Sequence, residues 1–376
     1  MVKPVHVLHS VSAMNMGGIE NFVMNLYRSV DRSVIQFDFV YAVDEPCLFD
    51  DEIKSLGGRI FKFQSPNKHP LAAGRFYNAI FNEHPEIKVL HGHLSDLTGN
   101  LGVFGSAKRN GIAKRAIHSH SSSTSISDGL EGLVMLFNAR RNVKRIENLA
   151  TDYFACSDKA SNCMFPNAAE RGLNVRLINN GIDVNRFTYD ENKRLTVRKQ
   201  LGISPDTLVI GNVARLVQVK NQAFLLKILR YLIDKVDVAL LIVGDGPLRQ
   251  SLEKEGRELG VSDRVYFTGR QNDSAPYYSA MDLYCMPSIY EGLPVSCVEA
   301  QCNGLPLLLS DAVSRNSSYT KNVIFKSLSC SAFEWGDVAA SLMNLPITRF
   351  NGKDATVHAG FDINETAHLL QDYYLS

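Results

Sequence analysis

The chain lacks a charge imbalance that would point to nucleic acid. Its 376 residues carry 40 Lys and Arg against 39 Asp and Glu, a formal net charge of +1. Domains that bind nucleic acid are usually basic, with Lys and Arg gathered on one face. The composition therefore gives no reason to expect a nucleic-acid partner.

Long apolar runs are also missing, and no leader segment is expected. No uninterrupted apolar stretch reaches the roughly 18 residues that a membrane-spanning helix needs. The first residues, Met1–His6, do not begin the apolar segment that a signal peptide contains. We therefore expect a cytoplasmic protein.

Disulfide chemistry has little support. The seven cysteines are odd in number and include no CxxC pair. Cys156, Cys285 and Cys297 stand in apolar runs that are typical of buried strands or helices. Buried free thiols in a reducing compartment are expected, not a disulfide framework.

The chain is long enough for two domains of ordinary size. Short apolar, β-branched runs alternate with segments of helical period, such as the apolar face at Ile19, Phe22, Val23, Leu26 and Tyr27. This alternation predicts an α/β fold with parallel sheets covered on both faces. The expected strands are Val5–His9, Gln36–Tyr41, Arg59–Phe63, Ile87–His91, Ala113–His118, Asp152–Cys156, Leu208–Val213, Val238–Val243, Arg264–Phe267, Asp282–Met286 and Leu305–Leu309.

The alternation pauses at residues 179–187, where Asn180-Gly181 is turn chemistry. We place the domain boundary here. The prediction is an N-terminal Rossmann-like domain of residues 1–185 and a C-terminal one of residues 186–359, with ligands at the carboxyl ends of the strands.

The segment from Glu291 to Glu299 indicates chemistry. Gly292-Leu293-Pro294 separates the first carboxylate from a helix expected over residues 294–303. Proline suits the first helical position, and the free N–H groups of the first turn attract anions. Glu299 is placed to hydrogen-bond hydroxyls of the same ligand. A ligand with phosphate and vicinal hydroxyls, a sugar nucleotide, fits both; the alternative is an ordinary βα unit with solvated glutamates.

Two other loops carry phosphate-binding features. Gly17-Gly18 lies between the first strand and the first helix, where the backbone can approach a ligand closely. Arg215 and Lys220 follow a strand and precede the helix Gln222–Leu232. Two such cations can converge on one diphosphate and stabilise the charge that grows on it, without a metal.

These motifs resemble the large sucrose-synthase-like family of retaining glycosyltransferases, family 4. The E-x7-E of Glu291 and Glu299, the R-x4-K of Arg215 and Lys220 and the GG-x-E of Gly17-Gly18 match its pattern over nearly the whole chain. The resemblance implies a GT-B fold, two Rossmann-like domains facing a central cleft. It also implies a C-terminal helix at about residues 360–376 that crosses back onto the N-terminal domain.

The resemblance assigns further roles. Gly18 would touch the donor diphosphate or the transferred sugar, and His120 would face that sugar, although His118 is not excluded. Arg270 follows a segment similar to the one that lines the nucleobase pocket, and an ordinary surface arginine is the alternative. Gly244-Asp245-Gly246-Pro247 resembles the family's G-x-G-P element, which we interpret as structural.

Four histidines raise the question of a metal. His91-Gly92-His93 and His118-Ser119-His120 each place two side chains on one strand face, but no third ligand stands nearby in the sequence. No metal is therefore expected. Ser310–Asn316 departs from the family, because the second glycine-rich turn of many members is missing. This is similar to bacterial capsular and exopolysaccharide transferases.

The sequence thus predicts a retaining glycosyltransferase of the hexosyltransferase type (EC 2.4). It would move a sugar from a nucleotide-diphosphate sugar, a UDP-sugar by preference, to a hydroxyl of a lipid-linked surface glycan, with no cofactor. Peripheral contact with the inner membrane leaflet is expected through basic segments such as Lys108-Arg109, Lys114-Arg115, Arg140-Arg141 and Lys144-Arg145. A nucleotide-sugar epimerase of the same fold and a non-catalytic subunit of glycan synthesis remain alternatives.

Overall fold

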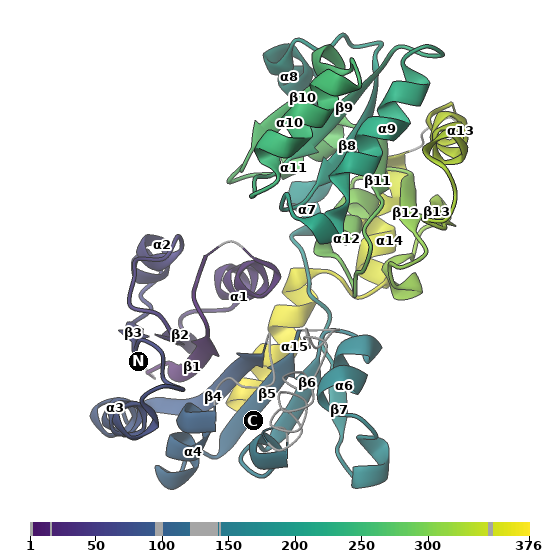
Figure 1. Cartoon of the computed structure of the whole chain (residues 1–376). Helices are drawn as coiled ribbons and strands as arrows, with labels where there is room; N and C mark the ends of the chain where they lie inside the picture. The colour runs from purple at the N-terminus through teal and green to yellow at the C-terminus, as the bar shows by residue number, and fades with distance from the viewer. Residues whose placement is uncertain (1–2, 16, 95–100, 121–141, 143, 345–348) are drawn as a thin grey trace. The chain divides into compact units, whose positions relative to one another are not determined.

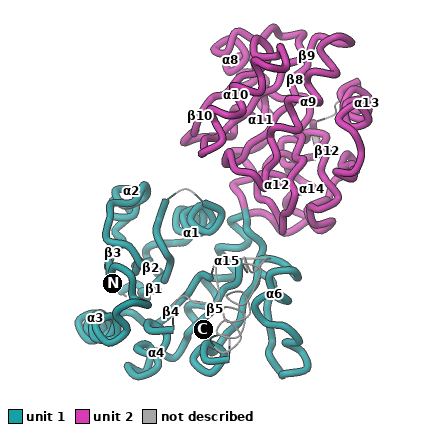
Figure 2. The backbone as a smooth tube through the Cα atoms, in the orientation of Figure 1, with its two compact units in different colours: residues 1–181, 363–376 teal, residues 182–362 magenta. Residues whose placement is uncertain are grey.

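The computed structural model describes residues 3–15, 17–94, 101–120, 142, 144–344 and 349–376. It divides into two compact units (Figure 2). Unit 1 holds residues 1–181 and 363–376, and unit 2 holds residues 182–362. The sequence placed these boundaries at 185/186 and 359/360.

Unit 1 is built on a seven-stranded parallel sheet in the order β3-β2-β1-β4-β5-β6-β7 (Figure 1). Its strands are β1 (Val5–Val11), β2 (Ile35–Tyr41), β3 (Ile60–Lys62), β4 (Ile87–Leu94), β5 (Lys114–Ser119), β6 (Asp152–Ala155) and β7 (Val175–Leu177). Its α-helices are α1 (Gly18–Ser29), α2 (Asp50–Ser55), α3 (Pro70–Glu83), α4 (Leu101–Arg109), α6 (Asp158–Met164) and α15 (Ile363–Leu375).

Both faces of this sheet are covered, as its uninterrupted apolar strands predict. Every residue of β2 is buried. One apolar core joins α1 and α15 to the sheet, and a second joins α3 and α4 to the other side. The apolar face predicted for α1 is the buried one, with Phe22, Val23, Leu26 and Tyr27 inside.

Unit 2 repeats the design with a six-stranded parallel sheet, order β10-β9-β8-β11-β12-β13. Its strands are β8 (Leu208–Val213), β9 (Val238–Val243), β10 (Val265–Gly269), β11 (Leu283–Met286), β12 (Leu307–Ser310) and β13 (Val323–Lys326). Its α-helices are α7 (Val184–Phe187), α8 (Glu191–Leu201), α9 (Gln222–Leu232), α10 (Arg249–Glu258), α11 (Ala275–Ala280), α12 (Val295–Cys302), α13 (Ala332–Met343) and α14 (Gly352–His358). The predicted fold class, two Rossmann-like α/β domains, is confirmed.

The C-terminal helix returns to unit 1. Figure 1 shows α15, in yellow, beside α1. Leu370, Tyr373 and Tyr374 are buried, and the Tyr373 hydroxyl donates to Asp152 Oδ2 at 2.8 Å. The two chain segments at the unit boundary, around residues 181 and 363, lie close together. A Cβ on Gly181 would lie 2.8 Å from the Cα of Ile363. Glycine is therefore the residue that fits at position 181.

All seven cysteines lie among the described residues and are free thiols, as predicted. No helix in the described parts of the chain is both long and apolar enough to cross a membrane. Of the basic segments, Arg140-Arg141 lies outside the described residues. Lys114 and Arg115 bind carbonyl oxygens of Tyr373 and Leu149 at 2.6 Å each, so these two cations also hold the fold together.

Candidate functional site

The predicted donor-site motifs of unit 2 lie where its strand order reverses. β8 sits between β9 and β11, so the loops after β8 and β11 leave neighbouring strands toward the same edge of the sheet. In open α/β sheets this switch point is where ligands bind. The Arg215–Lys220 loop follows β8, and the Glu291 loop follows β11.

An ion pair joins these two loops. Lys220 ends a short 3₁₀ turn, Gln218–Lys220, and its Nζ contacts Glu291 Oε1. The two side chains are only 20% and 15% exposed, so water screens the pair weakly. Backbone contacts support it, since Ile289 N–H donates to Val219 O at 2.8 Å. The structure thus brings together a cation and a carboxylate that lie 71 residues apart.

Arg215 lies in the same loop as Lys220 and is exposed. Among the described residues, no hydrogen bond or ion pair to its guanidinium is recorded, whereas its carbonyl accepts from Gln222 Nε2 at 3.1 Å. The loop backbone is therefore fixed while the cationic group is available to a ligand. A guanidinium fork matches phosphate oxygens bidentately.

The segment after Glu291 starts α12 as expected, with a shift of one residue. The helix spans Val295–Cys302, inside the predicted range, and Pro294 is its N-cap with extended φ −71° and ψ 121°. The sequence placed Pro294 at the first helical position instead. No side chain caps this end of α12. The N–H of Cys297 donates to Pro294 O at 3.0 Å, which leaves the first two N–H groups of the helix, those of Val295 and Ser296, as candidate anion donors. Glu291 itself forms a parallel bridge with Val313, in the segment that departs from the family pattern.

Glu299 lies on α12 and is partly buried. The hydroxyl of Tyr278, on α11, donates to Glu299 Oε2 at 2.5 Å. Removal from water raises the pKa of Glu299 to about 7, and the Tyr278 hydrogen bond only partly opposes this shift. A carboxyl group with a strongly shifted pKa is typical of a functional site. Tyr278 was not predicted, because a tyrosine in an apolar helix resembles an ordinary core residue.

The shifted pKa of Glu299 predicts a pH dependence. If its carboxylate accepts hydrogen bonds from the donor, kcat/KM should fall by about tenfold per pH unit below about pH 7. The free energy of unfolding should depend on pH in the opposite direction. Between pH 4.5 and 7 the folded chain keeps a proton that the unfolded chain has lost, so the free energy of unfolding falls as the pH rises. Glu299→Gln should flatten both profiles; unchanged profiles in this variant would assign the titration to another group.

The Gly244–Pro247 turn supports the Arg215 loop, which agrees with its structural interpretation. A Cβ on Gly244 would lie 2.0 Å from Ala214 O, and one on Gly246 would lie 2.5 Å from Leu216 O. Leu216 N–H also donates to Asp245 O at 3.0 Å. Glycine is needed at both positions because the backbone that carries Arg215 passes directly over them.

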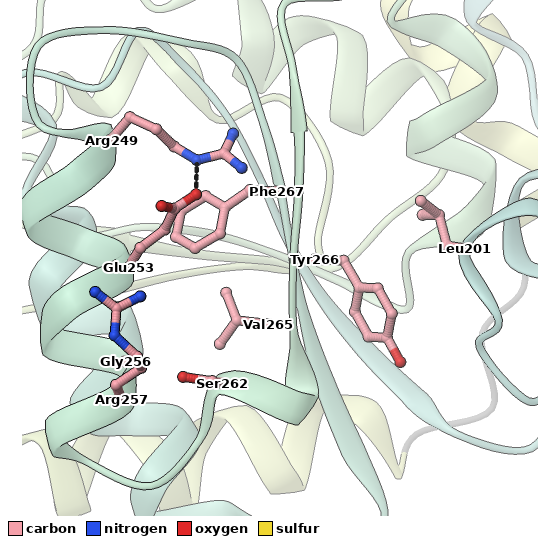
Figure 3. Close-up of a pocket in the computed structure, with 9 residues that line it drawn as sticks. All are labelled: Leu201, Arg249, Glu253, Gly256, Arg257, Ser262, Val265, Tyr266 and Phe267. Carbon is pink, nitrogen blue, oxygen red and sulfur yellow. Dashed lines mark hydrogen bonds and ion pairs between the residues drawn. The ribbon is translucent and has the colours of Figure 1, made fainter.

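Arg270 is exposed just after β10, where Gly269 turns with φ +70°. A pocket of about 440 Å³ lies elsewhere in this unit, between α10 and β10 (Figure 3). Arg249 pairs with Glu253 there at 2.5 Å and lies over the ring of Phe267. None of the predicted site residues lines this pocket.

In unit 1 the predicted residues follow two strands of the sheet, β1 at its switch point and β5 one strand beyond β4. Gly17 is the N-cap of α1 and Gly18 its first residue, with no side-chain cap. Space is available at Gly18, where a Cβ would meet nothing within 4 Å, but at Gly17 it would approach the Glu20 carboxylate. His120 follows β5 and is partly exposed, whereas His118 is fully buried. His120 Nε2 lies 3.0 Å from His93 Nδ1.

Comparison with known proteins gives a consistent result. The family model for glycosyl transferases group 1 matches residues 193–340. EpsF of Bacillus subtilis (strain 168), which is named as a glycosyltransferase, is 34% identical over 373 residues, covering 98% of this chain and 96% of that protein. The Escherichia coli UDP-Gal:alpha-D-GlcNAc-diphosphoundecaprenol alpha-1,3-galactosyltransferase is 30% identical over 154 residues, 40% of each chain. Anabaena HepE, crystallised with UDP, superimposes with a TM-score of 0.77 at 18% identity, covering 98% of this chain and 99% of HepE.

Proposed function

We propose that this chain, which belongs to the group 1 family of glycosyltransferases and is a glycosyltransferase enzyme, retains the anomeric configuration of the sugar it transfers. Unit 2 would bind a nucleotide-diphosphate sugar, and unit 1 would bind a hydroxyl of a lipid-linked glycan. The Lys220–Glu291 ion pair carries the donor-site proposal. A cation of the kind that binds phosphate and a carboxylate that could bind the sugar lie side by side at the switch point of the sheet, which supports the proposal.

Each group has a separate task in this proposal. Arg215 and Lys220 bind the diphosphate and stabilise the negative charge that grows on it as the sugar leaves. The uncapped start of α12, after Gly292 and Leu293, adds N–H donors to the same anion. Glu299 accepts hydrogen bonds from ribose hydroxyls, and Glu291 lies beside the sugar ring. The leaving phosphate would take the acceptor proton.

The assignments in unit 1 and at Arg270 follow from the family. Gly17 and Gly18, at the uncapped start of α1, would approach the diphosphate or the sugar, and His120 would face the sugar. Arg270 would contact the base. Contact with an anionic membrane stays a prediction, which co-sedimentation with anionic vesicles would measure.

The relatives support a UDP-sugar and a lipid-linked acceptor. The name of the E. coli relative contains UDP-Gal and a diphosphoundecaprenol-linked sugar. HepE has been crystallised with UDP and with UDP-glucose. We infer the same chemical classes for this chain, with no resident metal at the diphosphate because two cations already lie there.

A panel of sugar nucleotides tests the proposal. Ligands that bind only the folded chain raise its stability by RT ln(1 + [L]/Kd), so the true donor and its bare nucleoside diphosphate should both raise Tm. Transfer should continue in EDTA, and NMR of the product should show the donor's anomeric configuration. Turnover that EDTA abolishes and Mg²⁺ or Mn²⁺ restores would contradict the metal-free diphosphate site. Conversion of the donor alone to an epimer would identify an epimerase instead.

A further inference from the structure

Five histidines gather on three adjacent strands of unit 1. His9 lies on β1, His91 and His93 lie on β4, and His118 and His120 lie on or just after β5. The sheet places β1, β4 and β5 side by side. Its register pairs His9 with His91 and His93 with His118. His9 is far from the His91–His93 pair in the sequence, but the pairing of β1 with β4 brings its imidazole beside them.

Three of these histidines have the geometry of a metal site. His9, His91 and His93 are 0%, 0% and 3% exposed, and one ring nitrogen from each lies within 4.8 Å of the others. Their ring centroids lie 5.2, 5.2 and 4.3 Å apart. Two imidazoles on one tetrahedral zinc ion, with Zn–N of about 2.1 Å, place their nitrogens about 3.4 Å apart. The three nitrogens lie within 4.8 Å of one another, so side-chain rotations that move each nitrogen by about 1 Å would bring them to that spacing.

Two rings of the trio already meet through their nitrogens. His9 Nδ1 lies 2.9 Å from His93 Nε2, so a metal ion here would replace the proton that the two rings share. A neutral imidazole offers one lone pair, which is the metal-binding form. His9 Nε2 has no hydrogen-bond partner among the described residues.

An outer partner for one ligand is also present. The hydroxyl of Tyr374, on α15, lies 2.6 Å from His91 Nδ1. If this oxygen accepts from Nδ1–H, the lone pair of His91 is fixed on Nε2, on the other side of the ring. Metal-binding histidines usually have such a partner, whose loss costs about 10- to 100-fold in metal affinity.

We propose that His9, His91 and His93 bind one divalent ion of the zinc class in unit 1. Three imidazoles without a carboxylate ligand select zinc, cobalt or nickel over Mg²⁺ or Ca²⁺, which prefer oxygen. The ion would tie β1 to β4 and, through Tyr374, the returning helix α15 to the sheet. The alternative trio of His93, His118 and His120 shares one ligand with this site. It is disfavoured because His120 is partly exposed. These residues are not part of the diphosphate site proposed in unit 2, but His93 contacts His120, which the proposed function places at the sugar.

Zinc content of tag-free protein tests the proposal. Protein expressed in zinc-supplemented medium and passed through gel filtration should hold about one zinc ion per chain by mass spectrometry. X-ray absorption should show imidazole scattering and no sulfur ligand. Less than about a tenth of an equivalent, or a thiolate ligand, would overturn the proposal and leave the cluster a hydrogen-bonded core. This measurement needs no variant, so misfolding cannot obscure it.

Variants then locate the ion. His9→Gln should lower bound zinc about tenfold or more, Tyr374→Phe should weaken it about 10-fold, and His120→Gln should keep it. His69→Gln, at an exposed histidine of the same unit, is the control. Zinc lost from His120→Gln and kept by His9→Gln would overturn the assignment. Activity lost to a chelator and restored by Zn²⁺ but not by Mg²⁺ would trace to this site, not to the donor diphosphate.

Discussion

Replacing Arg215 or Lys220 with alanine is expected to lower kcat/KM by about 100-fold or more, roughly 3 kcal/mol of transition-state stabilisation. Negative charge grows on the diphosphate as its bond to the sugar breaks, and a cation fixed beside it gains strength at that moment. Lys220 is fixed by its ion pair with Glu291, and Arg215 is exposed in the same loop. Steady-state kinetics with one donor and one acceptor measures the effect.

A matched control separates this role from general loss of charge. Lys227 is an exposed cation on α9, the helix that follows the same loop, and Lys227→Ala should stay within about threefold of wild type. Arg215→Lys keeps the charge and loses the fork, so it should fall between wild type and Arg215→Ala. If Arg215→Ala and Lys220→Ala behave like Lys227→Ala, the pair is ordinary surface charge.

The strands and helices that carry the candidate donor site were predictable because their signals are local. β8 and β9 have the predicted bounds, since each is a continuous apolar run in a parallel sheet. The start of α12 follows from Gly-Leu-Pro, although proline became its N-cap. Two edge strands, β7 and β13, were missed. Both are short and partly exposed, and a cation interrupts or ends each run, as Arg176 does in β7.

Contacts between distant segments were not predictable from local patterns. Lys220 meets Glu291 only because β8 and β11, which β9 and β10 separate in sequence, are neighbours in the sheet. The histidine trio arises in the same way from β1 and β4. A sequence pattern shows which face of a strand a side chain occupies, whereas strand order decides what stands beside it. The sequence prediction that no third metal ligand lies near the His91–His93 pair did not take the strand order into account.

The two glutamates of the Glu291–Glu299 segment are expected to fail in different ways. Glu299, assigned to the ribose, contributes equally to ground state and transition state, so Glu299→Gln should raise the donor KM and leave kcat mostly intact. Glu291 is assigned to the sugar ring, where positive charge develops as the bond to phosphate breaks. Its effect grows only in the transition state, so Glu291→Gln should cut kcat by about 100-fold with a smaller change in KM.

The ion pair sharpens this contrast. Glu291→Gln removes the partner that orients Lys220, so Glu291→Gln and Lys220→Ala should be non-additive, with a coupling of about 1 kcal/mol or more in a double-mutant cycle. Glu299 pairs with Tyr278 instead, so Glu299→Gln and Lys220→Ala should add. Tyr278→Phe is the control for Glu299. It should shift KM in the same direction as Glu299→Gln, because the tyrosine only orients that carboxylate. If Glu299→Gln lowers kcat while Glu291→Gln only raises the donor KM, the two roles are reversed. If neither variant changes kcat or KM, the donor binds elsewhere.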